Sequence, residues 1–260
     1  MKMNLISVVM GSFNDQYSIS STIESILNQT YQNWEFIIID DNSTDDTQKI
    51  IESFLKDESR IKFYKNRENI GLAATLNRAI SISKGDFIAR MDADDISLNN
   101  RLEAQKALLD SKSEVMVVGS AAIYDDKVNK KRNLVKMPKT DFEIKKSIFK
   151  TSPFIHPSVM MRRDFIEKSG GYDIRYIRAQ DYELWLRGRL IGQYYNIQEP
   201  LIIYNNNNKH MLKGYFYTAR IRFTQSSSLS EYCFSFYWMI YEFLSILLLM
   251  IKKVWGLRYE

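Results

Sequence analysis

Short apolar runs and amphipathic stretches alternate along the first hundred residues of the chain. Each short run is almost continuously apolar, which is typical of a strand buried on both faces. Between the runs, apolar residues recur at the spacing of one helix face. The pattern predicts strands at residues 5–10, 34–40, 61–64 and 87–91, and helices from Ser18, around Ile50 and over 71–83.

This alternation predicts a parallel sheet with right-handed crossover connections. In such sheets, ligands bind beyond the carboxyl ends of the strands. Polar residues follow the predicted strands at that edge, namely Asn14, the pair Asp40 and Asp41, and the segment Asp92 to Asp95. Their convergence favours a nucleotide or metal site at this edge.

The acidic segment that follows the strand at 87–91 contains Asp92, Asp94 and Asp95. Neighbouring carboxylates repel one another, so the cluster requires a cation or a strong hydrogen-bond network. Carboxylate oxygens suit Mg²⁺ or Mn²⁺, with phosphate oxygens and water filling the remaining positions. Taken alone, the triplet could equally be a solvated turn that caps the helix starting near Leu98; its place at the sheet edge favours the metal.

Two common phosphate-binding loops are absent from the sequence. The turn after the first strand, residues 11–15, lacks the G-x-G-x-x-G pattern of dinucleotide folds, and no G-x-x-x-x-G-K-[ST] loop occurs. We therefore expect a cation, rather than a glycine loop, to bridge the phosphates of a ligand.

Composition sets broad limits on the protein. With 260 residues and 45% hydrophobic content, the chain can bury one large core plus a small appendage. Its single cysteine, Cys233, excludes an intrachain disulfide and favours a reducing, cytoplasmic setting; the apolar run at the N-terminus is too short for a signal peptide. The net charge of +5 is densest over Lys127 to Lys139, where no aromatic residues are interleaved. We expect a solvated loop there, or secondly a contact with an anionic membrane, and no nucleic-acid partner.

Motifs in a fixed order give the chain its family resemblance. They occupy residues 7–14, 25–31, 35–47, 69–77, 85–95 and 180–185. Together they resemble the family 2 glycosyltransferases of the GT-A (nucleotide-diphospho-sugar transferase) fold, over roughly residues 4–205; Gly11 stands where that family commonly has proline. The resemblance implies an α/β fold with a mostly parallel central sheet flanked by helices, followed here by an apolar C-terminal helix. It also implies a glycosyltransferase domain at 1–212, with a nucleotide-binding half at about 1–97 and an acceptor half at about 98–212.

The resemblance also implies roles at the nucleotide end. The donor-binding candidates are Asn14, Asp41, Asn69, Gly71, Arg90, Asp92 and Asp94. Asp41 would receive the uracil N–H, Asp92 would face the ribose and Asp94 would bind the metal on the diphosphate, with Asp95 as a possible further ligand. Arg90 would orient these acids or the sugar, unless it is a surface residue of an edge strand. Asn69 and Gly71 would allow close approach of the backbone to the donor, although a helix start explains them almost as well.

Asp181 is the predicted catalytic base. It lies in a Gln-Asp-Tyr-Glu-Leu-Trp motif in which Gln180 replaces the family's usual acid, and Glu183 is a distant second candidate. A helix N-cap is the structural alternative for Asp181. As a base that must be ionised, Asp181 is expected to keep an ordinary carboxylate pKa. Displacement with one base and no enzyme nucleophile would invert the anomeric carbon and give a β-linkage.

Two histidines complete the candidates. His156 could contact the acceptor or a metal, but a lone histidine is more often a hydrogen-bonded structural residue. His210 could contact the diphosphate or the metal after loop closure, with a flexible polar loop as the alternative.

The C-terminal region, 213–260, differs in composition and is expected to be a helical extension. Residues 234–251 are almost entirely apolar, with Glu242 near the middle and Lys252 and Lys253 after them. We expect a helix that lies in the membrane interface through 234–253, rather than one that spans it; a dimer or core-packing helix is the alternative. Membrane attachment, peripheral and on the cytoplasmic side, would suit an enzyme with a lipid-linked acceptor.

The leading functional prediction is a transferase that moves a sugar from a nucleotide diphosphate, expected to be UDP, to a glycan or lipid-linked acceptor with Mn²⁺ or Mg²⁺. The alternative is a nucleotidyltransferase or a catalytically silent sugar-nucleotide-binding protein on the same fold. A nucleotidyltransferase would require a glycine- and arginine-rich loop after the first strand, and none is present.

Overall fold

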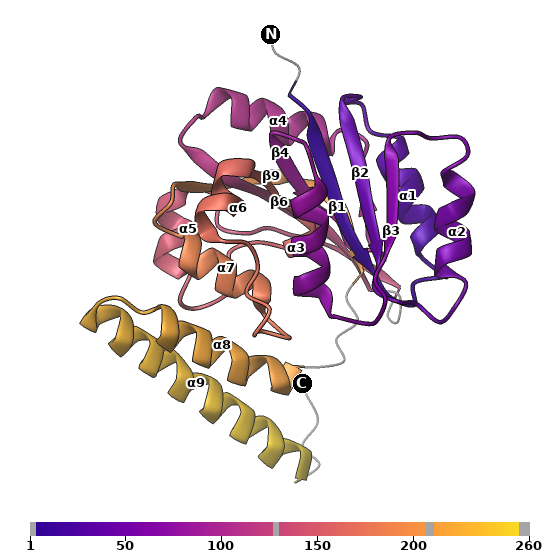
Figure 1. Ribbon diagram of the computed structural model, residues 1–260. Coiled ribbons are helices and arrows are strands. Elements are labelled where there is room, and N and C mark those ends of the chain that lie inside the picture. The colour runs from indigo at the N-terminus through magenta and orange to yellow at the C-terminus, as the bar shows by residue number, and fades with distance from the viewer. Residues whose placement is uncertain (1–3, 127–129, 206–210, 255–260) are drawn as a thin grey trace.

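The computed structural model describes residues 4–126, 130–205 and 211–254 (Figure 1). The first part of the chain forms β1 (Ile6–Ser12), α1 (Ile19–Leu27), β2 (Trp34–Asp40), α2 (Thr47–Phe54), β3 (Ile61–Lys65), α3 (Leu72–Ile82), β4 (Phe87–Arg90), β5 (Ile96–Ser97) and α4 (Arg101–Ser111). The remainder forms β6 (Val115–Asp126), β7 (Lys131–Val135), α5 (Asp141–Ser147), the 3₁₀ turn η1 (His156–Ser158), β8 (Met160–Arg162), α6 (Arg163–Ser169), α7 (Gln180–Gly188), β9 (Gln193–Asn205), α8 (Met211–Gln225) and α9 (Leu229–Val254).

One sheet joins the two halves of the chain in the order β3-β2-β1-β4-β8-β6-β9-β5, and β7 pairs with β6. The strands β1 to β4 are parallel, which confirms the alternation predicted from sequence. Beyond β4 the sheet is mixed, because β8 is antiparallel to both β4 and β6. The expectation of a mostly parallel sheet therefore describes the first half of the fold, since β8 arrives through a short 3₁₀ turn instead of a crossover helix.

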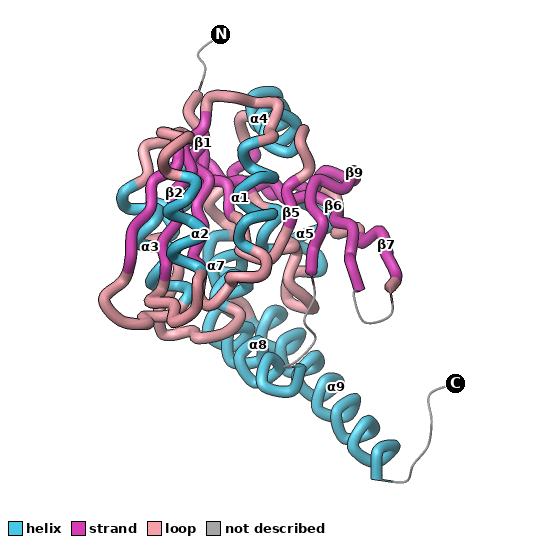
Figure 2. Tube along the Cα trace, turned by 90° about the vertical axis from the view of Figure 1, so that its right-hand side faces the viewer, coloured by secondary structure: helices cyan, strands magenta, loops and turns pink. Residues whose placement is uncertain are grey.

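Two apolar cores cover the two faces of the sheet, and Figures 1 and 2 show helices on both of its sides. Alternate residues of β1 point to opposite sides: Val8 packs with α1 and α2, whereas Val9 packs with α3 and α7. This double burial explains why β1, β2 and β4 are apolar runs instead of alternating patterns.

The helices α8 and α9 form an antiparallel pair below the sheet, as Figures 1 and 2 show. Ile221 and Arg222 of α8 are buried, and Arg222 donates to the backbone oxygen of Lys150 (2.8 Å). The predicted apolar helix is present as α9, although it begins at Leu229, before the predicted residue 234. Among the described residues, no helix has both the length and the apolarity needed to cross a membrane.

Candidate active site

The carboxyl ends of several strands meet at one edge of the sheet. Strands β1, β2 and β4 run in the same direction. Strands β6 and β9 share that direction, because β8 lies between β4 and β6 in the sheet and is antiparallel to both. The edge therefore brings together the turn after β1, the acidic loop after β4, and Tyr204 and Asn205 at the end of β9. The sequence predicted the first two of these contributions and did not predict the pairing of β9 beside them.

The carboxylates of Asp92, Asp94 and Asp95 form a compact cluster, with oxygen atoms within 4.8 Å of one another. Asp95 is fully buried, and its Oδ1 accepts a hydrogen bond from the N–H of Asn205 (2.8 Å). Its Oδ2 has no hydrogen-bond partner among the described residues. Burial and the charges of Asp92 and Asp94 raise the pKa of Asp95 to about 8, although the Asn205 hydrogen bond opposes the shift. A buried acceptor without a donor, beside two further carboxylates, fits a hard divalent cation.

Asn205 fastens the end of β9 to this acidic loop. Besides its backbone bond to Asp95, its side-chain amide donates to the backbone oxygen of Asp94. Asparagine here holds the loop through hydrogen bonds. The other candidate of this segment, His210, lies outside the described residues.

Arg90 lies under the acidic loop at the end of β4. It is buried and forms an ion pair with Asp92. Burial lowers the pKa of Arg90, but the attraction of Asp92 outweighs that effect and the pKa is raised. The alternative of a surface residue on an edge strand is wrong, because β4 is paired with β1 on one side and β8 on the other. The structure thus supports the predicted role in orienting the acids.

A second buried cation, Arg101, supports this arrangement and was missed in the sequence. Its guanidinium donates to the backbone oxygens of Arg90 (2.7 Å) and Val159 (3.3 Å). Burial, together with the positive charge of Arg90, lowers the pKa of Arg101 to about 9. An arginine at the start of a helix gives no sequence signal that it will be buried; here its partners include the side chains of Gln105 and Met91 as well as the two backbone oxygens.

Asp181 lies in the first turn of α7. The N-cap of this helix is Ala179, whose φ of 56° places it in the left-handed region, so the N-cap alternative for Asp181 is wrong. Burial raises the pKa of Asp181, opposed by a hydrogen bond from the N–H of Tyr182 and by the charge of Arg90. The expectation of an ordinary pKa is therefore wrong, because the cleft shields the carboxylate from water. A raised pKa makes Asp181 a stronger base once it is ionised.

Electrostatic interactions connect Asp181 to the acidic loop. The negative charge of Asp92 raises the pKa of Asp181 further, and Arg90 acts on both carboxylates. The same charges act on the hydroxyl of Tyr204: burial, then Asp92, Asp95 and Asp181, raise its pKa to about 12. These mutual effects support the prediction that the metal candidates and the base candidate face one cleft.

His156 packs beneath this cleft against Tyr172. Its Nε2 lies 2.8 Å from the Tyr172 hydroxyl, and its ring is in edge contact with Trp185. Burial and the nearby Arg90 lower the pKa of His156 well below 6.5, so the ring is neutral at pH 7. The geometry favours the structural alternative over direct contact with the acceptor.

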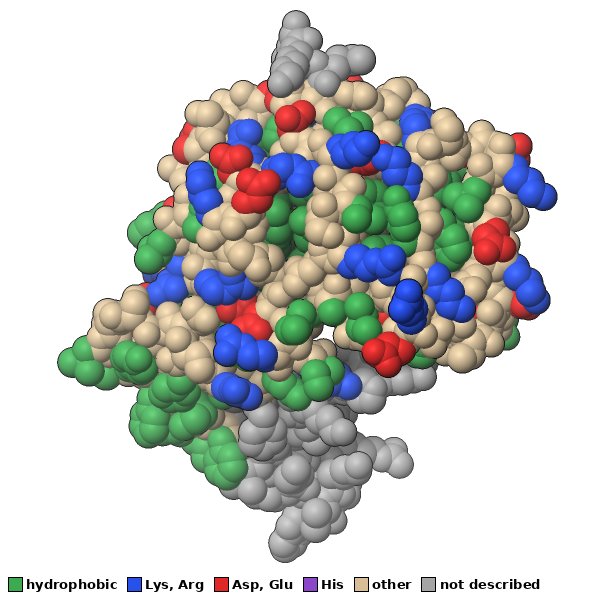
Figure 3. Space-filling view, viewed as in Figure 1, with side chains coloured by type: hydrophobic (Ala, Val, Ile, Leu, Met, Phe, Trp, Pro, Cys, Tyr) green, Lys and Arg blue, Asp and Glu red, His purple; other side chains and the backbone are tan. Residues whose placement is uncertain are grey.

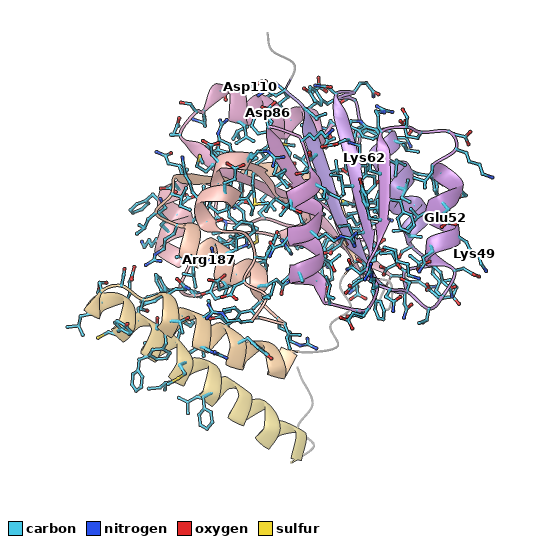
Figure 4. The ribbon with its side chains drawn as sticks, in the orientation of Figure 1. Lys49, Glu52, Lys62, Asp86, Asp110 and Arg187 are labelled. Carbon is cyan, nitrogen blue, oxygen red and sulfur yellow. The ribbon has the colours of Figure 1, made fainter. Side chains whose placement is uncertain are left out.

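The carboxylate of Glu183 has a structural role. Its carboxylate forms a two-point ion pair with Arg187 (2.7 and 2.8 Å) and accepts from Gln225 of α8 (3.0 Å). Arg187, labelled in Figure 4, also donates to the backbone oxygen of Gly171 (2.7 Å). This network holds α7 in place and leaves Asp181 as the candidate base.

Asp41 holds the loop before α3 through hydrogen bonds at the predicted nucleotide site. Its Oδ1 accepts from Asn66 (2.7 Å) and from the N–H of Ile70 (3.0 Å), and its Oδ2 accepts from the N–H of Gly71 (2.8 Å). Gly71 has φ of 83°, so the backbone here requires glycine. Asn69 is exposed in the same loop. One acceptor position therefore remains on Asp41 Oδ2 for a base N–H.

Asn14, with φ of 58°, joins the turns after β1 and β2: its Oδ1 accepts from the N–H of Thr44 (2.8 Å). Its neighbour Asp15 was not singled out in the sequence. Burial, followed by the charges of Asp94, Asp92 and Asp45, raises the pKa of Asp15 to about 6, despite a hydrogen bond from the N–H of Phe13. Asp15 therefore adds a further acid to the edge that faces the acidic loop.

Fold and site define a class, the nucleotide-sugar transferases of GT-A fold. The sequence profile of Glycosyl transferase family 2 matches residues 7–170, and the chain belongs to this family. The chain is 40% identical over 202 residues to the glycosyltransferase EpsE of Bacillus subtilis, which covers 75% of this chain and 71% of EpsE. It is 33% identical over 193 residues to WfaP of Escherichia coli, named as a UDP-Glc:alpha-D-GlcNAc-diphosphoundecaprenol beta-1,3-glucosyltransferase, over 71% of this chain and 70% of WfaP.

Solved structures agree on the fold. S. aureus TarS in complex with UDP superposes with a TM-score of 0.71 at 17% identity, over 88% of this chain and 68% of TarS residues 1–349. The Pyrobaculum calidifontis mannosyltransferase PcManGT, in complex with GDP-Man and Mn²⁺, superposes with a TM-score of 0.62 at 19% identity, over 83% of this chain and 60% of that chain. TarS also forms a complex with UDP-GlcNAc.

Proposed function

We propose that this glycosyltransferase is a metal-dependent, inverting enzyme that moves a sugar from a UDP-sugar to a hydroxyl of a glycan or lipid-linked acceptor. The observation that supports it most is the effect of the Asp92 charge, which raises the pKa of Asp181 and so supports a base candidate near the cluster of metal-ligand candidates. A sugar bound between them would have its reacting carbon within reach of both groups.

Asp92 and Asp94 are the proposed ligands for Mn²⁺ or Mg²⁺, and Asp95 is the possible third. The unpartnered Oδ2 of Asp95 supports this assignment, as does the Mn²⁺ complex of PcManGT on the same fold. When bound, the cation would neutralise charge on the departing diphosphate. Arg90 would keep Asp92 in place, and Asn205 would keep the loop closed around the ligands.

Asp181 is the proposed general base. In the reaction, the acceptor oxygen forms a bond to the anomeric carbon while the bond from that carbon to the diphosphate oxygen breaks, and the proton of the hydroxyl passes to Asp181. Attack from the face opposite the diphosphate inverts the carbon, so an α-linked donor gives a β-linked product. The β-1,3 linkage in the name of WfaP supports this outcome.

UDP is the proposed nucleotide. Asp41 would receive the uracil N–H through its remaining acceptor position, while Asn14, Asn69 and Gly71 shape the loops around the base. The UDP and UDP-GlcNAc complexes of TarS support a uridine donor, and the name of WfaP adds a diphosphoundecaprenol-linked acceptor. Because PcManGT forms a complex with GDP-Man, GDP-sugars are the alternative donors to test.

We further propose that residues 1–212 form the transferase domain and that the extension 213–260 rests on the cytoplasmic face of a membrane through 234–253. Large apolar side chains of α9 support this placement, since Phe236, Tyr237, Ile240, Tyr241 and Phe243 are all exposed. Such a location would bring the active site to a lipid-linked acceptor.

Release of nucleoside diphosphate tests the proposal. A panel of UDP- and GDP-sugars is supplied with membranes as the source of acceptor, in Mn²⁺, Mg²⁺ or chelator. We expect UDP release from at least one UDP-sugar, abolished by chelator and by Asp94→Ala. A catalytically silent binder would bind UDP with Mn²⁺ but release nothing, and release of pyrophosphate from a nucleoside triphosphate and sugar phosphate would identify a nucleotidyltransferase.

A further inference from the structure

A surface pocket of about 640 Å³ lies between the body of the protein and the start of α9. It is lined by Lys139 before α5, Lys146 on α5 and Lys150 after it, with Phe234 of α9 closing one side. All three lysines are exposed, and none forms an ion pair within the part of the chain that the structure describes. The pocket thus gathers three positive charges that form no ion pair with the described carboxylates.

One acid, Glu143, also lines the pocket. Its Oε2 accepts hydrogen bonds from the backbone N–H of Lys139 (2.8 Å) and of Thr140 (2.9 Å), as part of the capping box of α5. These bonds lower the pKa of Glu143. Its charge therefore serves the start of the helix, and the pocket keeps an excess of positive charge.

The wall formed by α9 continues into an exposed aromatic face. The side chains of Phe236, Tyr237, Ile240, Tyr241, Phe243 and Leu244 recur at helical spacing and are 42–65% exposed. Figure 3 shows apolar side chains gathered at this end of the molecule. The opposite side of α9 is fixed to the body, through the ion pair of Glu231 with Arg189 (3.1 Å) and the contact of Ser235 with Ser226 (3.0 Å). The aromatic face therefore points away from the protein.

Trp238 connects this face to the lysines. Its ring lies 6.1 Å from that of Phe234 and 5.1 Å from that of Tyr241, and the Nζ of Lys150 lies 4.9 Å from its centroid. Tryptophan and tyrosine beside lysine are typical of the boundary between lipid headgroups and acyl chains. Lysine side chains at such a boundary bury their stems and extend their ammonium groups to phosphate.

We propose that the pocket lined by Lys139, Lys146 and Lys150 binds the phosphate of an anionic phospholipid headgroup while the aromatic face of α9 enters the membrane surface. This inference rests on the membrane part of the proposed function and adds a site to it. Charge complementarity favours an anionic membrane as the occupant. The lysines would face the negatively charged headgroups, and the aromatic face would lie at the acyl chains beneath them.

Vesicle binding by the full chain tests the site. Vesicles of phosphatidylcholine alone are compared with vesicles of phosphatidylcholine and phosphatidylglycerol in equal parts, at low salt. The test variant joins Lys139→Gln, Lys146→Gln and Lys150→Gln. The control joins Lys49→Gln, Lys56→Gln and Lys84→Gln, which removes the same charge from exposed positions; Lys49 lies on α2, away from α9 (Figure 4).

The test variant is expected to bind anionic vesicles about 10-fold or more weakly than the unmodified chain, and the control by about 2-fold at most. Equal losses in the two variants, or equal binding of the unmodified chain to both kinds of vesicle, would overturn the headgroup site and leave α9 as an uncharged membrane contact. Failure to bind any vesicle would overturn the site and the membrane proposal together. A dimer in solution that dissociates on Phe236→Ser would then assign the aromatic face to a second copy.

Discussion

Arg90 forms a buried ion pair with Asp92, directly below the acidic loop at the edge of the sheet. The Nε and Nη1 atoms of Arg90 have no hydrogen-bond partner within the described chain. A buried charge with incomplete hydrogen bonding is costly for folding, so its place here points to function. Its positive charge also favours the ionised form of Asp181, and so one side chain acts on both sides of the cleft.

Arg90→Met should weaken both stability and metal binding. Removal of one partner of the ion pair leaves Asp92 uncompensated beside Asp94 and Asp95, so we expect the melting temperature to fall. Asp92 loses its partner, and we expect affinity for Mn²⁺ with UDP to fall by about 10- to 100-fold. Thermal unfolding and calorimetric titration measure the two effects. A variant that is much less stable, with unchanged affinity, would assign Arg90 to the core alone.

The pH dependence of kcat/KM should report the raised pKa of Asp181. The base must be ionised, so activity is present above this pKa and is lost as the pH falls through it. The acidic limb of the profile should therefore lie at higher pH than that of an ordinary carboxylate, because burial raises the pKa. In Arg90→Met the limb should move to higher pH again, since Arg90 lowers this pKa. An acidic limb at the ordinary value in both proteins would contradict the assignment.

Asp15→Asn should stabilise the metal-free protein at neutral pH. The folded-state pKa of Asp15, about 6, lies above its ordinary value of 3.8. Stability contributed by this group is present below pH 4 and is lost as the pH rises through about 6. We expect the variant to gain about 1–2 kcal/mol at pH 7 and nothing at pH 4, in urea unfolding.

Saturating Mn²⁺ should shrink that gain, because a cation at Asp92 and Asp94 offsets their repulsion of Asp15. Asp45→Asn is the matched comparison at a neighbouring acid. Although burial alone would raise the pKa of Asp45, hydrogen bonds from Thr47 and Gln16 lower it, and its neutralisation should destabilise the protein at pH 7. The same sign in both variants would show that charge repulsion at this edge is not the cause.

Adjacent glycines before α7 offer a paired test of packing. Gly170 and Gly171 both have positive φ, of 75° and 76°. A Cβ on Gly171 would lie 2.7 Å from Oδ1 of Asn77, which accepts from the N–H of Tyr172 (2.8 Å), whereas a Cβ on Gly170 meets nothing within 4 Å. Gly170→Ala should cost about 1 kcal/mol from the backbone alone. Gly171→Ala should cost about 1–3 kcal/mol more, because the new methyl group displaces the side chain of Asn77 and breaks its hydrogen bond with Tyr172. Equal costs in urea unfolding would contradict this role of Asn77.

The apolar pattern was sufficient to predict the nucleotide half of the fold. Residues 34–40 form β2 as predicted, and β1, β3 and β4 lie within one or two residues of the predicted runs. A continuous run of β-branched residues between turn signals favours a buried strand. The helix α8 lies within the extension predicted to be helical at 213–260, but its bounds were not predicted because residues 211–225 show no clear apolar face. The strand β5 was missed because two residues give no periodic signal.

The sequence predicted which residues form the candidate site, but not which of them are buried or how their pKa values shift. The order of motifs identified Asp92, Asp94 and Asp181; the structure clusters Asp92 and Asp94 with Asp95, and the charge of Asp92 acts on Asp181. The burial of Arg90 and Arg101 could not be predicted, because charged residues are rarely buried and nothing in their local sequence shows that they are. The raised pKa of Asp181 was missed for a related reason, since it depends on how much protein surrounds the carboxylate.

Turnover by Asp181→Asn tests the central claim most directly. UDP release from the preferred UDP-sugar is measured with acceptor at saturating Mn²⁺, beside calorimetric binding of UDP with Mn²⁺ to the same preparation. Asparagine keeps the size of the side chain and cannot accept the proton, so turnover should fall by about 10²- to 10⁴-fold while UDP binding stays unchanged. Full turnover in this variant would contradict the assigned base and, with it, the active site described above.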